Sequence, residues 1–172
     1  FVQALRPKQW TKNLLVFAGV VFAQQAGERA LLLRAAAGFL AFSLLASTVY
    51  VLNDLRDVEA DRQHVKKRLR AIASGKLPPG VAWASLPALL AVAGAIAWWL
   101  GPGFTWVLVA YLASNLAYSF GLKHHVILDV FLIAGGFVMR AVAGVELLKP
   151  VAAGTQISPW LLVCTFFGAL FL

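Results

Sequence analysis

Residues 31–61 of the chain read LLLRAAAGFLAFSLLASTVYVLNDLRDVEAD, a long apolar run followed directly by the densest group of acids in the sequence. The apolar run ends at residue 52, and four of the seven acidic residues of the chain lie within positions 53–61. A helix of about 20 apolar residues is long enough to cross the core of a bilayer. The stretch therefore predicts a membrane helix that delivers carboxylates to one edge of the bilayer.

The composition of the whole chain indicates an integral membrane protein. Hydrophobic residues make up 61% of the sequence and charged residues only 13%, whereas soluble domains have about 25% charged residues. The formal net charge of +8 would suggest nucleic acid in a soluble protein. Here membrane topology explains it, so we expect no nucleic-acid partner. The single cysteine, Cys164, lies in an apolar run and excludes a disulfide within the chain.

Six segments approach the length of a membrane span, namely 14–26, 31–52, 81–100, 104–118, 126–145 and 159–172. Their connections are short except for the one at 54–80, and Gly101-Pro102-Gly103 predicts a tight turn. We therefore expect an all-α integral membrane fold, a transmembrane helical bundle that forms a single domain over residues 1–172. The chain begins without methionine and stops inside an apolar stretch, so we expect the domain to lack its C-terminal part.

Basic residues are distributed unequally between the two sides of this bundle. With the amino terminus inside, one side receives three basic residues before the first segment, seven in the long loop and one after the fourth segment. That side then holds eleven of the fifteen basic residues. Because Lys and Arg gather in cytoplasmic loops, the acidic cluster is predicted to face the cytoplasm. Arg34 and Arg140 fall inside predicted spans, where a charge requires a partner or a wet cavity.

The acidic cluster has the spacing of ligands on one helical face. Asn53, Asp57 and Asp61 are four residues apart and Asp54 is one step round, so all four line one face if the helix continues. Hard oxygen ligands at this density suit Mg²⁺. The alternative interpretation is a solvated acidic loop that offsets the charge of a basic one.

The cations that follow the acidic cluster suit a phosphate. Lys66, Lys67, Arg68 and Arg70 could bind a phosphorylated substrate or neutralise a phosphoryl leaving group. They could equally anchor the loop to anionic lipid headgroups. The Ser-Gly turn within residues 70–76, flanked by cations, resembles an anion-binding bend.

Further polar residues follow the fourth segment. Tyr118 and Lys123 precede Asp129, which begins the fifth segment. A Lys and an Asp at the same membrane edge as the acidic cluster could close a polar cavity over it, or form a structural ion pair. Arg140 lies about three turns deeper than Asp129. A phosphate, a lipid phosphate or a partner on another helix would explain a cation at that depth.

With these residues in view, the chain resembles the UbiA superfamily of intramembrane prenyltransferases. The pattern Asn53-Asp54-x-x-Asp57-x-x-x-Asp61 matches the first aspartate-rich motif of that superfamily. Other stretches are similar to its branch of decaprenyl-phosphate phosphoribosyltransferases: RPKQWTKN at 6–13, residues 61–64, 67–68 and 72–75, and residues 123–144, which end FVMRAVAG. Val65 and Ala71 stand where that branch usually has proline, which predicts a less rigid loop.

The resemblance implies a nine-helix fold, of which about six helices are present, with a second polar motif after the sixth. It implies transfer of 5-phosphoribose from phosphoribosyl diphosphate to a polyprenyl phosphate, for cell-wall arabinan synthesis, at the cytoplasmic face of a bacterial plasma membrane. Mg²⁺ would be held by the catalytic residues Asp54, Asp57 and Asp61. The candidate substrate contacts are Asn53, Lys12, Lys67, Arg68, Tyr118, Lys123, Asp129 and Arg140.

Two other functions stay open at the level of the sequence. The first is transfer of a prenyl group from a polyprenyl diphosphate to an aromatic acceptor, which uses the same metal cluster. The second is a transporter or ion-binding membrane module, which predicts carboxylates deep within the spans, whereas this cluster lies at an edge. The sequence gives neither the isoprenoid length nor the oligomeric state, and an oligomer is compatible with it.

Overall fold

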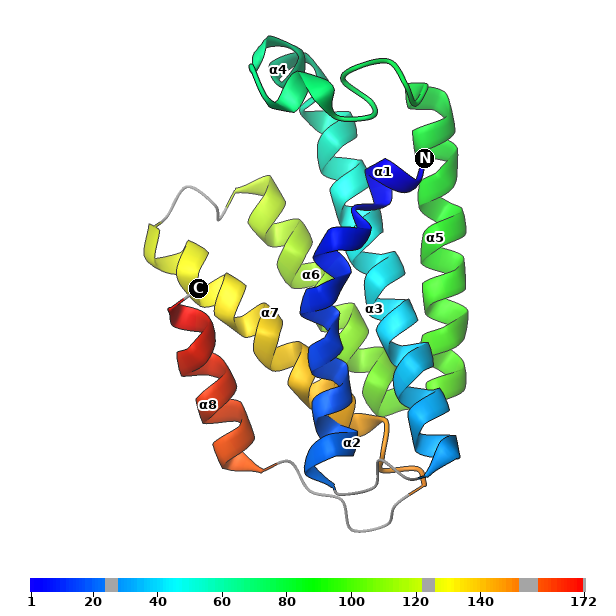
Figure 1. Cartoon of the computed structure of the whole chain (residues 1–172), viewed down its shortest axis with the longest axis vertical. Helices are drawn as coiled ribbons and strands as arrows, with labels where there is room; N and C mark the ends of the chain where they lie inside the picture. Colours follow the sequence, from blue (N-terminus) through cyan, green and yellow to red (C-terminus); the bar gives the residue numbers. More distant parts are fainter. Residues whose placement is uncertain (24–27, 122–125, 152–157, 172) are drawn as a thin grey trace.

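The computed structural model of the chain describes residues 1–23, 28–121, 126–151 and 158–171, and these residues contain helices and no strand. The helices are α1 (Val2–Leu5), the 3₁₀ helix η1 (Pro7–Phe17), α2 (Ala18–Phe22), α3 (Arg29–Arg56), α4 (Val58–Gln63), the 3₁₀ turn η2 (Lys67–Leu69), α5 (Pro79–Leu100), α6 (Pro102–Phe120), α7 (Val126–Glu146) and α8 (Pro159–Leu170). Figure 1 shows them as a bundle of elongated elements, with α4 and its loop projecting at one end.

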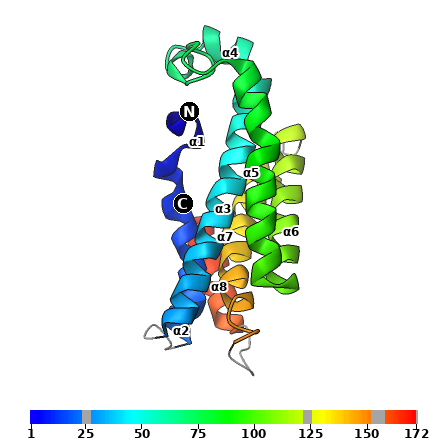
Figure 2. The ribbon, with the colours of Figure 1, turned by 90° about the vertical axis from the view of Figure 1, so that its right-hand side faces the viewer.

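Helix α3 lies at the centre of the bundle. It packs against α5, η1, α1 and α6, while α7 packs against η1, α2, α6 and α8, and Figure 2 shows α3 and α5 running side by side. Among the described residues, three helices are long and apolar enough to cross a bilayer, namely α3, α5 and the part of α7 from Leu128 to Glu146. The expected all-α membrane fold is confirmed.

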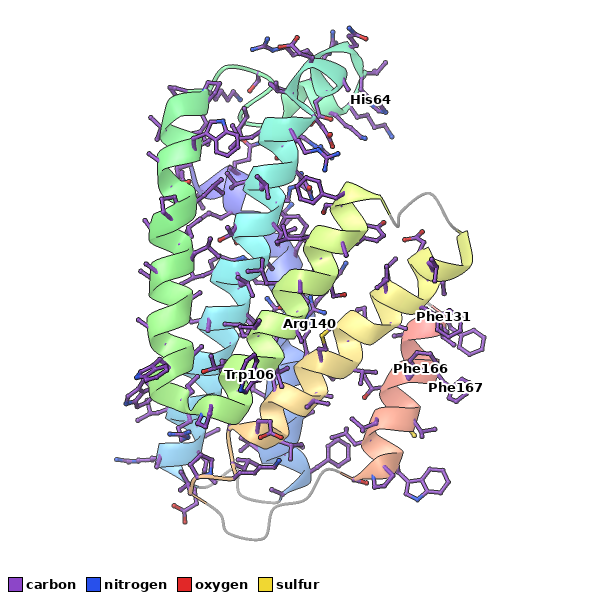
Figure 3. All side chains as sticks on the ribbon, turned by 180° about the vertical axis from the view of Figure 1, so that it is seen from behind. His64, Trp106, Phe131, Arg140, Phe166 and Phe167 are labelled. Carbon is purple, nitrogen blue, oxygen red and sulfur yellow. The ribbon has the colours of Figure 1, made fainter. Side chains whose placement is uncertain are left out.

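Large apolar side chains cover the outside of the bundle. Trp98, Trp99 and Trp106 are exposed, and Figure 3 shows Trp106 and the group of Phe131, Phe166 and Phe167 projecting from the helices. In a soluble protein such exposure would be unfavourable, since apolar area in water costs about 25 cal/mol per Å². In a bilayer the same side chains meet lipid, so the surface fits a membrane protein.

The first predicted span differs most from its expectation. It begins at Pro7, runs as a 3₁₀ helix to Phe17 and ends as the short helix α2 at Phe22. A 3₁₀ helix has three residues per turn, so residues three apart are stacked in one row. The row Trp10, Asn13 and Val16 is the face of η1 that turns to the bundle, with Asn13 and Val16 fully buried.

This row matches a row of serines on α3. Trp10 Nε1 donates to Ser47 Oγ at 3.0 Å, and Asn13 Nδ2 donates to Ser43 Oγ at 3.0 Å. Three residues of 3₁₀ helix rise about 6 Å, as do four residues of α-helix. The two antiparallel rows therefore keep the same spacing, which fixes the register of η1 on α3.

A close glycine contact joins the other side of η1 and α2 to α7. A Cβ atom added to Gly19 would overlap the carbonyl of Gly144, and one added to Gly144 would overlap the carbonyl of Val16. Glycine is required at both positions because the two backbones touch. The contact lies one helical turn beyond Arg140, and it holds η1 against α7 where both elements carry polar side chains.

Candidate active site

Two buried carboxylates lie at the end of α3 where the acidic motif begins. Asp54 and Asp61 are each only 2% exposed. Arg70 Nη1 lies 2.7 Å from Asp61 Oδ2 and 3.2 Å from Asp54 Oδ1, and Arg6 Nη2 also donates to Asp54 Oδ1. The two carboxylates therefore converge on one cationic nitrogen atom.

The local fold of the long loop brings Arg70 back to the carboxylates. Ala71, Ile72 and Leu77 are buried in a small apolar core that they share with residues of α1, α3 and α5. The N–H of Leu77 donates to the carbonyl of Ala71 at 2.8 Å and closes the turn, in which Gly75 adopts φ +77°. Because the apolar residues anchor this turn, the guanidinium beside them points to the carboxylates, and the bend does not present Arg70 as a free anion-binding cation.

The helix carrying the motif does not continue as expected. Helix α3 ends at Arg56, Asp57 has φ −97° and ψ 12°, and α4 begins at Val58. The sequence places the four motif residues on one helical face only if the helix continues, and the break at Asp57 means that this condition is not met. Asn53 faces a cavity on one side of α3, while Asp54 pairs with arginines elsewhere on the helix. Asp54 and Asp61 are seven residues apart, and the backbone bonds from Asp57 N–H to Asn53 O (2.9 Å) and from Asp61 N–H to Asp57 O (2.8 Å) span the break, so both side chains still reach Arg70.

The carboxylate pair has the donor chemistry of a magnesium site. Within the described residues, no group of three or more His, Cys, Asp or Glu side chains is arranged to hold a metal ion. However, Asp54 and Asp61 already direct oxygen atoms at a common cation, Arg70. Mg²⁺ takes one or two protein carboxylates together with water and phosphate oxygens. These two residues therefore fit Mg²⁺, with half-buried Asp57 on the intervening turn.

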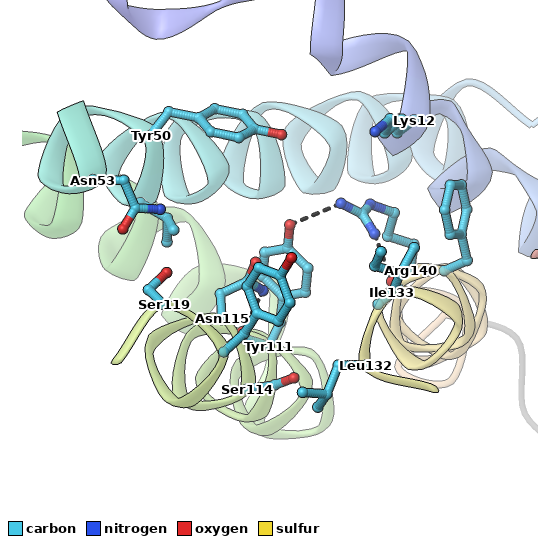
Figure 4. A pocket seen from close by; sticks show the side chains of 14 residues that line it. Lys12, Tyr50, Asn53, Tyr111, Ser114, Asn115, Ser119, Leu132, Ile133 and Arg140 are labelled. Atoms are coloured by element: carbon cyan, nitrogen blue, oxygen red, sulfur yellow. Dashed lines mark hydrogen bonds between the residues drawn. The ribbon is translucent and has the colours of Figure 1, made fainter. Parts of the chain in front are cut away.

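A cavity of about 290 Å³ opens between η1, α3, α6 and α7, as Figure 4 shows. Its lining residues are Lys12, Val49, Tyr50, Asn53, Tyr111, Ser114, Asn115, Tyr118, Ser119, Leu132, Ile133, Gly136, Phe137 and Arg140. The charged residues in this lining are Lys12 and Arg140, and both are cations. A polar cavity that contains positive charge and no carboxylate is suited to an anion.

Arg140 lies at the buried side of this cavity and is 6% exposed. Its Nε donates to Asn13 Oδ1 at 2.8 Å, Nη1 donates to the carbonyl of Gly136 at 2.7 Å, and Nη2 donates to the Tyr111 hydroxyl at 2.8 Å. The guanidinium also lies 4.8 Å from the centre of the Tyr111 ring. All of these partners are neutral, so they orient the positive charge without cancelling it.

Comparison with known proteins places the chain in a family. Residues 13–172 match the UbiA prenyltransferase family. The chain belongs to this family. In a solved structure of a UbiA homolog from Archaeoglobus fulgidus, bound to DMAPP and Mg²⁺, the matching part has a TM-score of 0.77 and 22% sequence identity. That match covers 98% of this chain and 59% of the archaeal one, and it shows that the UbiA fold is shared.

Curated relatives of this UbiA-family chain include proteins from two mycobacterial species. It is 44% identical over 176 residues to the decaprenyl-phosphate phosphoribosyltransferase of Mycolicibacterium smegmatis, a match that covers 99% of this chain and 54% of the relative. It is 42% identical over 175 residues to the Mycobacterium tuberculosis protein of the same name, which covers 99% and 56%. The chain spans about half the length of these relatives.

The predicted site residues of this UbiA-family chain fall into separate groups. Lys12, Asn53, Tyr118 and Arg140 line the cavity, whereas Asp54 and Asp61 form the arginine-bridged pair. Lys67 and Arg68 are exposed on η2 and do not line the cavity. Asp129 is half-buried in the first turn of α7. Lys123 lies outside the described residues, and its role stays a prediction.

Sequence reasoning missed several polar side chains at the site. Asn13, Tyr50, Tyr111 and Asn115 are not among the predicted site residues, and Arg6 enters the sequence analysis only for topology and as part of the stretch 6–13. A signal was present on the fourth span, because Tyr111, Asn115 and Tyr118 follow one another at steps of four and three, the spacing of one helical face. No comparable signal linked Arg6 or Arg70 to the carboxylates, since those contacts join segments 48 and 16 residues apart.

Proposed function

We propose that the protein containing this chain transfers 5-phosphoribose from phosphoribosyl diphosphate to a polyprenyl phosphate such as decaprenyl phosphate, with Mg²⁺ as cofactor and pyrophosphate as the second product. The observation that carries the proposal is that two sites of different charge meet on α3, where Asp54 belongs to one and its neighbour Asn53 to the other. One is the carboxylate pair, which fits a metal, and the other is the cavity whose charges are Lys12 and Arg140. The names of the mycobacterial relatives support the choice of substrates.

Both substrates carry phosphate groups, and the cavity provides the contacts that phosphates require. Arginine offers planar paired donors, and lysine offers a mobile point charge, which together suit phosphate oxygens. The hydroxyl and amide groups of Tyr50, Asn53 and Asn115 can complete the shell around a phosphate or a ribose. Because the cavity lies between helices of a membrane bundle, we expect the phosphate of a membrane lipid to enter it from the bilayer.

The proposed reaction exchanges one bond at the anomeric carbon of ribose. The bond from this carbon to the diphosphate oxygen breaks, and a bond to a phosphate oxygen of the polyprenyl phosphate forms. The attacking phosphate is already an anion, so no side chain has to remove a proton. Lys12 and Arg140 orient phosphate oxygens, and the site needs no base.

The carboxylates act on the leaving group. Asp54 and Asp61, together with Asp57, would hold Mg²⁺, which would supply positive charge to offset that of the departing pyrophosphate. Arg70, which these carboxylates bind in the structure, would then be free to contact the diphosphate.

We also propose that this site faces the cytoplasm of a bacterial plasma membrane, from which water-soluble phosphoribosyl diphosphate would enter. The lipid product would serve arabinan synthesis for the cell wall.

The proposal is tested with membranes that contain the intact protein. They are incubated with Mg²⁺, polyprenyl phosphate and phosphoribosyl diphosphate labelled in the ribose. We expect label to move into the lipid phase only when both substrates and Mg²⁺ are present. If no labelled lipid forms under these conditions, the proposed reaction is wrong.

A second candidate is transfer of a prenyl group from a polyprenyl diphosphate to an aromatic acceptor. It is favoured by the aromatic rings that line the cavity, those of Tyr50, Tyr111, Tyr118 and Phe137, on which an aromatic acceptor could stack. Labelled prenyl diphosphate distinguishes the two reactions. Release of pyrophosphate from it in the presence of an aromatic acid, with no use of phosphoribosyl diphosphate, would favour the second candidate.

A further inference from the structure

We propose that Asn13 is a positioning residue that aims the guanidinium of Arg140 into the cavity and, because it is neutral, leaves the positive charge available to a phosphate-bearing ligand. The inference deepens the proposed function and rests on it for the kinetic part of its test. It assigns to η1 a role in substrate affinity beyond packing.

The orientation of Asn13 follows from its two partners. The residue is 1% exposed, with Arg140 Nε 2.8 Å from Oδ1 and Ser43 Oγ 3.0 Å from Nδ2. Arginine can only donate hydrogen bonds, so the atom that faces Arg140 must be the acceptor Oδ1. The other end of the amide then donates to Ser43, and both ends of the side chain are fixed.

The contacts of Arg140 leave part of its guanidinium for a ligand. A guanidinium has five N–H donors, and the contacts within the described residues use one on Nε, one on Nη1 and one on Nη2. One N–H on each terminal nitrogen is therefore left beside a cavity that Arg140 lines. Two N–H groups on adjacent nitrogens match the paired oxygen atoms of a phosphate.

The neutral charge of Asn13 is as important as its shape. Aspartate has nearly the same size, and at this position it would form a buried ion pair with Arg140. Its second oxygen could accept a hydrogen bond from the Ser43 hydroxyl, so the fold would be kept. The cavity would then lose one of its two cations, and an anion would bind more weakly.

The test compares the intact wild-type protein with Asn13→Asp and Ser43→Ala. The measurements are KM for each substrate, kcat, the melting temperature, and the Kd for inorganic pyrophosphate and for inorganic phosphate by calorimetry. For Asn13→Asp we expect KM for one substrate, and the Kd for at least one of the two anions, to rise roughly 30-fold or more. We expect kcat to change less than KM and the melting temperature not to fall.

Ser43→Ala is the matched control. It removes the second contact of Asn13 but keeps the neutral acceptor for Arg140, so the anion Kd should change by no more than about 3-fold. The Arg140→Gln background provides a second check. If Asn13 acts through Arg140, adding Asn13→Asp to Arg140→Gln should raise the Kd far less than it does in the wild-type protein.

The outcomes separate this inference from the proposed function. If the wild-type protein transfers no phosphoribose but binds pyrophosphate or phosphate, and Asn13→Asp weakens that binding, the proposed reaction fails and the role of Asn13 stands. If both variants lower the melting temperature and leave KM and Kd unchanged, Asn13 is merely structural and the inference is overturned. Equal anion binding by Asn13→Asp and wild type overturns it as well, as does a wild-type protein that binds neither anion.

Discussion

The contacts of Asp54 and Asp61 indicate a structural role in addition to the metal binding that we propose. Each is buried and accepts a hydrogen bond from Arg70, and Asp54 also accepts one from Arg6. Removing Asp54 leaves the partly buried guanidinium of Arg6 without its counter-ion, and removing Asp61 takes from Arg70 the nearer of its two carboxylates. Both losses are costly, because the cations stay partly buried. Asp57 is half-buried, and the described contacts include no hydrogen bond to its side chain. The three acids of the motif therefore separate into two that also hold the structure and one that does not.

This difference gives a prediction for alanine variants of the acids. Asp57→Ala should lower Mg²⁺-dependent transfer roughly 100-fold or more, with normal membrane insertion and an unchanged melting temperature. Asp54→Ala and Asp61→Ala should lose activity to a similar degree and also melt at a lower temperature. Activity and thermal unfolding of the purified proteins check this, and full activity of Asp57→Ala would contradict its metal role.

Arg34 is the second arginine inside a span, and it is half-buried. Its partners lie at the other end of the bundle from the carboxylates. Its guanidinium donates to the carbonyl of Leu147 at 3.0 Å and to that of Leu100. These carbonyls belong to the C-terminal ends of α7 and α5, which carry partial negative charge and lack partners in their own helices. One side chain of α3 therefore joins the ends of two other helices.

We expect Arg34→Met to lower the free energy of unfolding by about 1–3 kcal/mol, because two charged hydrogen bonds to helix ends are lost. The site should keep its affinity for pyrophosphate, since Arg34 and Asn53 are separated by most of the length of α3. Lys149→Met is the control, because Lys149 is the exposed partner in its ion pair with Glu146, and pairs with an exposed lysine contribute about 0–1 kcal/mol. An equal effect of both variants in chemical unfolding would refute the bridging role.

At the scale of the helices, the contact between Gly19 and Gly144 controls how closely η1 and α2 approach α7. Gly136, Arg140 and Gly144 are four residues apart on α7, so they lie on one face of that helix. The carbonyl of Gly136 accepts from Arg140, and Gly144 meets the backbone of η1. The glycine contact thus sets the distance across which Asn13 reaches Arg140.

Gly144→Ala should therefore destabilise the protein by roughly 1–3 kcal/mol, because the added methyl group meets a carbonyl that cannot move aside easily. It should also weaken anion binding by displacing Asn13 from Arg140. Gly135→Ala on the same helix is the matched control, since a Cβ there has nothing within 4 Å. Alanine is a better helix former than glycine, so this control should be neutral or slightly stabilising. Similar melting temperatures for the two variants would show that the contact is unimportant.

Sequence reasoning predicted α7 to within one residue of its described bounds, and it did nearly as well for the two helices that proline and glycine delimit. Helices α5 and α6 begin at Pro79 and Pro102 and are separated by Gly101, within two residues of the expected bounds. The 3₁₀ helix η1 was not predictable, because an apolar pattern does not distinguish a long 3₁₀ helix from an α-helix. The break at Asp57 was missed because the acid spacing fits a continuous helix. The pairing of Arg70 with Asp54 and Asp61 depends on how the loop folds back.

At the scale of the whole molecule, the basic loops predict one orientation in the bilayer. The loop that carries η2 should be cytoplasmic, and Lys149 should lie on the opposite side. In a Cys164→Ser background, a membrane-impermeant maleimide should label Lys149→Cys in intact cells. It should label Lys67→Cys only after the membrane is opened. The reverse pattern would overturn the cytoplasmic placement of the site.

The matched rise of η1 and α3 also restricts the length of the chain, and not only its residue types. An insertion of one residue between Trp10 and Asn13 would rotate every later side chain of η1 by about 120°. Asn13 would then lose its contacts with both Ser43 and Arg140, and Gly19 would no longer face Gly144. We therefore expect the segment from Pro7 to Gly19 to tolerate many substitutions at its exposed positions. A single insertion or deletion should not be tolerated, because it would shift every later contact out of register.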